Sequence, residues 1–171
     1  FNRAREVFEQ IVRERPDDHD AKSDLALCRN NIALILAREG KTDAALESYR
    51  KAIDAQRELV KRFPENEQYR GDLALSCQNL SLLEHQTGND EAAGKACMEA
   101  IGIEEGLVRR NPRAPRYLSH LATSYTNLGR FRSADDPAFA EQYLLKALEI
   151  QKKLIETYPD VLEYKNDLVL N

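Results

Sequence analysis

Four prolines divide the chain at nearly equal intervals. Pro16, Pro64, Pro112 and Pro159 are separated by 48, 48 and 47 residues. Two further sets of residues keep the same step, namely Ala4, Ala52, Ala100 and Ala147, and Leu25, Leu73, Leu121 and Leu168. Registers that recur together at such a period are typical of repeat proteins, in which each unit packs mainly against its neighbours. The chain is therefore expected to be an array of similar units.

Each unit is predicted to contain two helices, here called helix A and helix B, because two stretches with helical apolar spacing lie between successive prolines. Helix A is expected to begin after the proline, with Asp17 or, in the last unit, Asp160 as its N-cap, and to end at Gly40 or Gly88 in a left-handed conformation. Helix B is expected to end before the next proline, which disfavours helical geometry in the residue before it. Its predicted N-caps are Thr42, then Asn89 or Asp90, then Asp136, which precedes Pro137.

These helices predict an all-α fold, an α-solenoid of antiparallel helical hairpins with about three full repeats and partial helices at both ends. We expect a single array over residues 1–171. Residues 1–15 are expected to form helix B of a preceding unit, 16–63, 64–111 and 112–158 the three units, and 159–171 the start of helix A of a fourth. Because both ends fall within a unit, the chain is expected to belong to a longer array or a larger protein.

Composition disfavours several functions. The chain is 32% charged with a net charge of -4 and has no dominant basic stripe, so nucleic acid is not expected as a partner. It contains no long apolar span, so no membrane association is expected. Cys28, Cys77 and Cys97 lack metal-ligand spacing, and we expect no cofactor, no metal and a reducing, cytoplasmic location. The common nucleotide-binding and hydrolase motifs are missing, so an enzyme is not expected.

One face of helix A is predicted to stay outside the packing between helices. In the second unit the opposite face carries small and apolar residues and is expected to be buried. That packing face consists of Leu73, Ala74, Cys77, Leu80 and Ser81. The outward stripe of the same unit runs through Asp72, Leu75, Asn79 and Leu82, and its counterparts are Leu27, Asn31, Leu34 and Arg38 in the first unit and His120, Asn127 and Arg130 in the third.

The units resemble tetratricopeptide (TPR) repeats. The family's small residue after an Asn-Leu-like pair is matched by NIA (31–33), NLS (79–81) and NLG (127–129). Its Ala–large–Ala pattern along helix B is matched by Ala45, Tyr49 and Ala52, by Ala93, Cys97 and Ala100, and by Ala140, Leu144 and Ala147. The step of 48 residues exceeds the family's usual length of about 34, so both helices look elongated. In this respect the chain is similar to the arrays of kinesin light chains and of bacterial signalling proteins, including Ser/Thr kinases.

The resemblance implies a right-handed superhelix whose concave surface is lined by helix A, and a non-catalytic scaffold that binds a protein or peptide partner there. An extended peptide or a partner helix is the expected ligand, because an Asn amide can pair with both polar groups of a peptide bond. The expected binding residues are Asn31, Asn79, Asn127, Leu27, Leu34, Leu75, Leu82, Arg38, His120 and Arg130. Alternatively, the Asn amides bond to an adjacent helix and set the angle between units.

A second hypothesis is that the array is an oligomerisation or regulatory segment of a larger signalling protein such as a Ser/Thr kinase. Self-association could use the exposed terminal helices or helix B of the second unit. On that helix Gly94, Met98, Gly102 and Gly106 share one ridge. The other explanation of this ridge is the close approach of a neighbouring helix.

Overall fold

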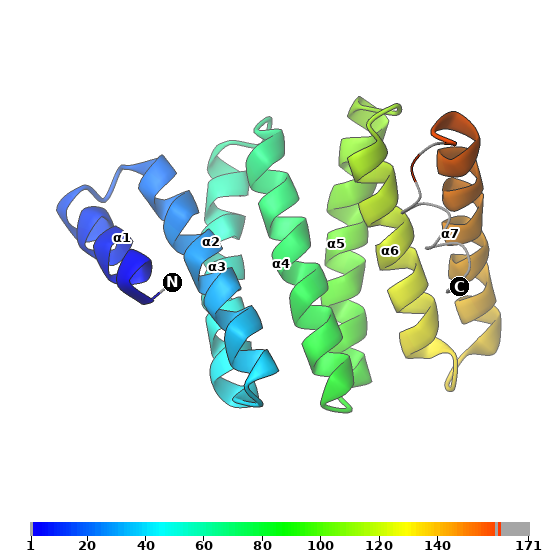
Figure 1. The fold of residues 1–171 in the computed structure, drawn as a ribbon, viewed down its shortest axis with the longest axis horizontal. Coiled ribbons are helices and arrows are strands. Elements are labelled where there is room, and N and C mark those ends of the chain that lie inside the picture. The colour runs from blue at the N-terminus through cyan, green and yellow to red at the C-terminus, as the bar shows by residue number, and fades with distance from the viewer. Residues whose placement is uncertain (1, 160, 162–171) are drawn as a thin grey trace.

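The structure is a computed structural model that describes residues 2–159 and 161, and this part of the chain contains seven α-helices and no strand (Figure 1). The expected all-α solenoid is confirmed. The fourth helix A, predicted within residues 159–171 with Asp160 as its cap, lies almost wholly outside the described residues. The helices are α1 (Asn2–Glu14), α2 (His19–Arg38), α3 (Thr42–Arg62), α4 (Glu67–Gln86), α5 (Asp90–Arg110), α6 (Pro115–Arg132) and α7 (Pro137–Thr157).

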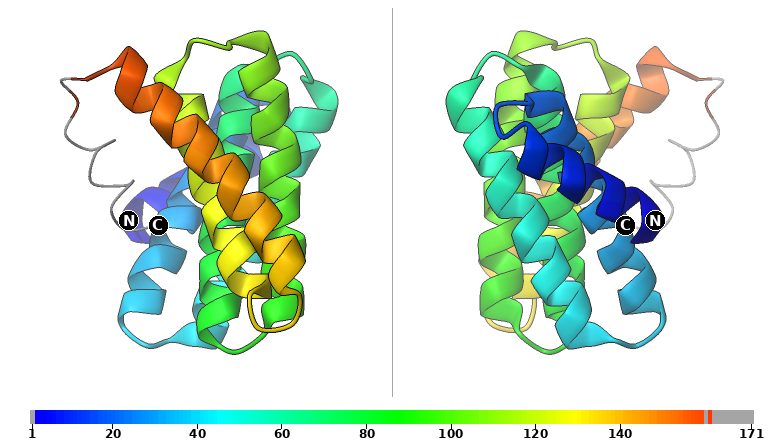
Figure 2. Two further views of the ribbon diagram at one scale, coloured as in Figure 1. Left: turned by 90° about the vertical axis from the view of Figure 1, so that its right-hand side faces the viewer. Right: turned by 90° about the vertical axis from the view of Figure 1, so that its left-hand side faces the viewer.

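The helices form antiparallel hairpins that stand side by side: α2 with α3, α4 with α5, and α6 with α7 (Figure 1). Helix α1 packs on α2 ahead of the first hairpin. Viewed along the array, α1 and α7 are inclined to the more upright central helices (Figure 2). The A helices contact one another directly, α2 with α4 and α4 with α6, whereas α3, α5 and α7 have no contact of similar extent between them in the described chain. The A helices therefore line the tighter, inner side of the array.

The first helix of each of the first two hairpins ends at the predicted glycine. Gly40 and Gly88 have φ angles of +73° and +80°, and they are the only residues of the described chain with positive φ. This left-handed conformation ends α2 and α4 and is open to glycine without a steric penalty. The third hairpin turns at residues 133–136 without such a glycine, and Asp136 caps α7 by accepting a hydrogen bond from the backbone N–H of Phe139 at 3.0 Å.

Two predicted N-caps are wrong by one residue. Asp18, not Asp17, accepts the hydrogen bond of the first turn of α2, from the N–H of Ala21 at 2.9 Å, because the helix begins at His19. At the start of α3, Lys41 occupies the cap position without a side-chain bond, and Thr42 is already helical. Of the two candidates for α5, Asn89 is the cap.

The hydrophobic core is divided into clusters along the array rather than gathered at one centre. Leu73, Ala74, Cys77 and Ser81 are buried, as the packing face of helix A was predicted to be, and Leu80 is half-buried. Small residues of the B helices lie at the contacts between helices and let them approach closely. Those with 3% exposure or less are Ala45, Ala52, Ala93, Cys97, Ala100, Ala140 and Ala147.

The glycine ridge of α5 does not mark a close approach of helix backbones. A Cβ atom at Gly94 or Gly106 would meet only arginine side chains, and one at Gly102 would meet open space. The close approach occurs instead between α6 and α7, where a Cβ atom at Gly129 would lie 2.8 Å from Cγ of Leu144. The close approach of a neighbouring helix is therefore wrong as an explanation of the ridge, because the neighbouring backbones do not come near it.

Candidate functional site

The predicted leucine stripe lies on the inner helices and remains partly open to solvent. Leu34, Leu75 and Leu82 are 36%, 38% and 37% exposed, and Leu27 is half-buried. Leu27 and Leu75, like Leu34 and Leu82, occupy equivalent positions one unit apart. Arg38 and Arg130 are exposed near the ends of α2 and α6. The A-helix face thus carries both partly exposed leucines and exposed arginines.

The three asparagines of the stripe have different environments. Asn79 is half-buried, and its Nδ2 donates to Oδ1 of Asn30 at 3.1 Å, which links α4 to α2. Asn30 in turn donates to Oδ1 of Asn31 at 3.4 Å. Asn127 is only 7% exposed. The bond between α4 and α2 supports the packing alternative for Asn79, since it joins two units.

A cavity of about 120 Å³ lies between α4 and α6 on the same side. It brings together three residues of the predicted stripe, Asp72, Leu75 and His120. Two residues of α5, Glu104 and Leu107, also line it. The remaining lining residues are Glu67, Gln68, Gly71, Ala74, Arg116 and Tyr117.

A buried polar cluster joins three helices at this cavity. The Nε2 group of Gln78 in α4 donates to Oε1 of Glu104 in α5 at 2.9 Å and lies 2.7 Å from Oγ of Ser124 in α6. It also contacts the carbonyl oxygen of His120 at 3.1 Å. One amide therefore ties the second unit to the third.

Two carboxyl groups that line the cavity are poorly solvated. Glu104 is 1% exposed and Asp72 is 8% exposed. Burial raises the pKa of Glu104 to about 8 and also raises the pKa of Asp72, because a desolvated carboxylate is unstable. The nearby hydroxyl of Ser124 and a hydrogen bond from Gln68, respectively, oppose these shifts. Burial and the neighbouring Arg116 lower the pKa of His120, so its neutral form is favoured.

The position of Glu104 is a recurring one on the B helices. Gln56 and Gln151 occupy it in the preceding and following units, and both are buried. In the first unit Asn30 takes the place of Gln78 and is shorter by one methylene. There both amide atoms of Gln56 and the hydroxyl of Ser76, the counterpart of Ser124, have no hydrogen-bond partner. The longer side chain of Gln78 thus reaches the groups on the two neighbouring helices, whereas the shorter Asn30 leaves the equivalent groups of the first unit without hydrogen bonds.

Comparison with known families agrees with this geometry. Two tetratricopeptide repeat models match the sequence, one over residues 25–65 and the other over 74–106. The chain is a TPR-like repeat protein. Neither match extends into the third unit, where the turn lacks the glycine of the other two.

Solved structures show the same fold. One is BtubC (BKLC) from P. vanneervenii, which superposes with a TM-score of 0.62 at 20% identity over 88% of this chain. The TPR-like chain spans 56% of that structure's length, little more than half. No curated protein matches the sequence.

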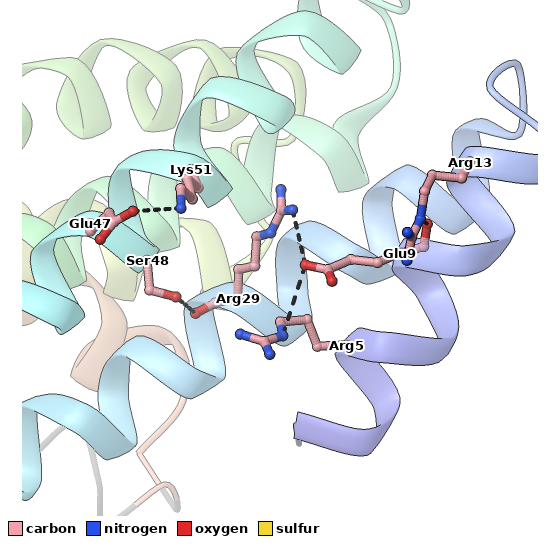
Figure 3. Close-up of polar contacts among 7 residues, drawn as sticks. All are labelled: Arg5, Glu9, Arg13, Arg29, Glu47, Ser48 and Lys51. Atoms are coloured by element: carbon pink, nitrogen blue, oxygen red, sulfur yellow. Dashed lines mark hydrogen bonds and ion pairs between the residues drawn. The ribbon is translucent and has the colours of Figure 1, made fainter.

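The outer side of the TPR-like array has two cavities at equivalent junctions, of about 230 and 400 Å³. Figure 3 shows polar contacts of residues around the first, where Glu9 of α1 lies 3.3 Å from Nη2 of Arg29 and 3.8 Å from Nε of Arg5. In the same view Ser48 of α3 donates to the carbonyl oxygen of Arg29 at 2.9 Å, and Lys51 pairs with Glu47. Three helices are thus held by polar contacts around this cavity.

Charge alternates along these outer junctions. Glu9 and Lys51 line the first cavity, and their counterparts one unit later are Arg57 and Glu99. Arg57 donates to both oxygens of Glu99 at 2.8 and 2.6 Å, and this pairing raises the pKa of the arginine. At the third junction the counterparts are Glu105 and Lys146, and both contact Tyr125. Each junction thus carries one acidic and one basic side chain at these two positions, directly paired only at the second, and their order reverses from one unit to the next.

Sequence reasoning missed Gln78, Glu104 and Arg116 at the inner cavity. A charged residue such as Glu104 on a B helix resembles an ordinary solvated position when read alone. The signal that could have revealed it is the alignment of units, which places Glu104 in register with Gln56 and Gln151. Two polar amides at one slot of an amphipathic helix indicate a position that faces a polar cluster.

Other chemical features can be stated only for the described residues. Within them no group of three or more potential ligands could hold a metal ion. No helix among those residues is long and apolar enough to cross a membrane. The three cysteines are unpaired; Cys77 and Cys97 are buried, and burial raises the pKa of Cys97 to about 12.

Proposed function

We propose that this TPR-like protein is a non-catalytic scaffold that binds an extended peptide or a helix of a protein partner along its A-helix face. The proposal is carried by the leucine stripe, in which Leu75 and Leu82 stay more than a third exposed on a helix whose opposite face is buried. Apolar side chains exposed at regular spacing mark interaction surfaces. TPR repeats generally mediate protein interactions, which agrees with this use of the inner side.

Polar residues beside the stripe would orient the ligand. Arg38 and Arg130 are exposed and can pair with acidic groups, and His120 lies at the cavity. Asn31 is half-buried and retains access for a contact with the peptide main chain. Asn79 is also half-buried, but its Nδ2 is engaged by Asn30 between α4 and α2, so a ligand contact would fall to its Oδ1. We assign Asn127 to packing instead, because it is buried.

The stripe can be tested with peptides selected from a random phage-displayed library on the wild-type chain. Their dissociation constants would be measured by fluorescence anisotropy. We expect the double variant Leu75→Glu/Leu82→Glu to weaken binding at least about tenfold, because two anchors would become charged. Met98→Glu is the matched control, since Met98 is 52% exposed on the outer helix α5. Equal loss in both variants, or retention in the first, would contradict the proposal.

A second candidate function is self-association through the B helices, as in a regulatory segment of a larger signalling protein. The observation that favours it is the exposure of Met98 and Leu145, which hold the same position on successive B helices. Light scattering of the wild type and of Met98→Glu would test it, and a monomer in both would rule it out. We expect either function to be exercised in the cytoplasm, because the cysteines are unpaired.

A further inference from the structure

The inner cavity has the size and position of a side-chain pocket. Leu75 belongs both to the exposed stripe and to the cavity lining, so a peptide on the stripe would pass its mouth. A volume of about 120 Å³ is several times the 10–15 Å³ that one water needs on this measure. The cavity can therefore hold the end of one long side chain.

Two of the residues that line this cavity each have one buried carboxyl oxygen without a hydrogen-bond partner. Oε1 of Glu104 is held by Gln78, whereas Oε2 is buried and unpaired. Oδ1 of Asp72 accepts from Nε2 of Gln68 at 2.8 Å, whereas Oδ2 is buried and unpaired. Buried polar atoms are nearly always paired, so two orphaned acceptors in one cavity call for a donor.

The charges at the cavity favour a cationic donor. Three carboxyl groups line it, and only that of Glu67 is engaged on both oxygens, by Asn111 and by the hydroxyl of Tyr117. Arg116 does not neutralise the other two, since its guanidinium lies 4.4 Å from the ring centre of Tyr117 and donates to that hydroxyl. Within the described residues Arg116 forms no ion pair.

The carboxyl group of Glu104 is not a requirement of the fold. The same slot holds Gln56 and Gln151 in the flanking units, and both are buried. An amide therefore fits the space between these helices. Only the second unit has a carboxyl group at this position, where the flanking units have a neutral amide.

We propose that the cavity between α4 and α6 receives the basic side chain, lysine or arginine, of a peptide bound along the A-helix face, with Glu104 and Asp72 accepting hydrogen bonds from its cationic group. This inference rests on the proposed function. An ammonium group has three donors and a guanidinium has five, so either carries enough donors for both unpaired oxygens. Bonds between a carboxylate and such a cation are among the strongest in proteins, and they give the pocket its selectivity.

Binding is expected to depend on pH. Burial raises the pKa of Glu104 to about 8, so the free pocket is mostly protonated at neutral pH, whereas a bound cation favours the carboxylate. The affinity for a cation therefore increases as the pH rises towards 8. The other titratable and charged groups that line the cavity or interact electrostatically with Glu104 are Glu67, Asp72 and Cys77 of α4, Cys97 of α5, and Arg116, Tyr117, His120 and Tyr125 of α6. The positive charge of Arg116 disfavours a bound cation, and the carboxylate of Asp72 stabilises it.

The pocket can be tested without a peptide partner. The probes are Nα-acetyl-lysine N-methylamide and its arginine, norleucine and glutamine counterparts, titrated into the full chain with labelled leucine methyl groups. We expect shifts of the Leu75 and Leu107 methyl signals that saturate at millimolar lysine or arginine probe at pH 8.5. The norleucine and glutamine probes should bind at least about tenfold more weakly, and the lysine affinity should fall about tenfold or more at pH 6.5.

Variants separate the pocket from general charge. Glu104→Gln should weaken the lysine probe at least about tenfold, and Asp72→Asn should weaken it less, while circular dichroism shows both to be folded. Glu91→Gln removes the same charge from the exposed face of α5, where it pairs with Lys95, and should change nothing. Equal binding of the lysine and norleucine probes, or an unchanged lysine affinity in Glu104→Gln, would overturn the inference. If library peptides still bound through Leu75 and Leu82 in that case, the proposed function would stand.

Discussion

Single polar residues at the unit junctions decide how neighbouring hairpins are joined. Asn79 donates to Asn30 across the first junction, and Gln78 reaches both Glu104 and Ser124 across the second. A difference of one methylene between Asn30 and Gln78 determines whether the buried slot on helix B is connected. The same kinds of side chain therefore give each junction its own hydrogen bonds, although the backbone is repeated.

The bond between Asn79 and Asn30 should be measurable as a coupling energy. We predict that Asn79→Ala and Asn30→Ala each destabilise the protein by about 1 kcal/mol, since each leaves a partly buried amide unpaired. In a double-mutant cycle measured by urea unfolding, the two effects should overlap by at least about 0.5 kcal/mol. Strictly additive effects would show that the bond contributes nothing.

The raised pKa of Glu104 makes stability depend on pH in a defined direction. The folded-state pKa of about 8 lies above the unfolded value near 4.3, so the folded protein binds more protons between these values. Stability from this group is full below about pH 4 and is lost as the pH rises towards 8. We predict that Glu104→Gln gains about 1–3 kcal/mol relative to the wild type between pH 5.5 and 8. Urea unfolding at several pH values tests this, and a difference independent of pH would contradict it.

Neighbouring helices approach one another more closely at some glycines than at others. Helices α6 and α7 come together at Gly129, which has no room for a side chain beside Leu144 and the carbonyl oxygen of Ala140. Helix α5 carries Gly102 on an exposed surface with free space around it. The two glycines look alike in the sequence, yet only one is needed for packing.

A matched pair of substitutions separates these roles. We predict that Gly129→Ala destabilises the protein by about 1–3 kcal/mol, because the new Cβ would lie 2.8 Å from Cγ of Leu144. Gly102→Ala should stabilise it by about 0.5–1 kcal/mol, since alanine favours a helix interior more than glycine does. Thermal unfolding of both variants measures the effects, and effects of the same sign would refute the assignment.

The whole molecule is held together by contacts between neighbours, so its stability is expected to be a sum over units and junctions. The outer junctions add opposite charges to this sum. We predict that Arg57→Glu, which faces Glu99, costs about 0.5–1 kcal/mol, and that adding Glu99→Arg restores most of the loss. Unfolding at low and high salt provides the check: an Arg57→Glu effect that survives 1 M salt would not be electrostatic.

The architecture of the array was predictable, because its signals are tied to backbone geometry. The spacing of the prolines and the left-handed Gly40 and Gly88 define the hairpins, and the small residues of the B helices define their contacts. Asp17 was wrongly preferred to Asp18 because two adjacent aspartates are equivalent until the first helical residue is known. Individual contacts decide such details, and helical spacing does not encode them.

The inner cavity could be predicted only in part. Leu75 and His120 reach it from the stripe that helical spacing indicates, but Glu104 comes from the other helix of the hairpin. The burial of Asn127, compared with the half-buried Asn31 and Asn79, reflects the surroundings of each unit and not its register. Features that depend on three helices at once are visible only after the units are stacked.

The alternating charges of the outer junctions have a consequence for the ancestry of such arrays. Repeats are gained and lost by recombination, and a loss of residues 64–111 would join the first unit directly to the third. Arg57 would then stand opposite Lys146 in place of Glu99, and two cations would share one junction. Loss of two consecutive units would restore opposite charges. The order of the hairpins therefore determines which charges meet at each outer junction, although the backbone of the unit is repeated.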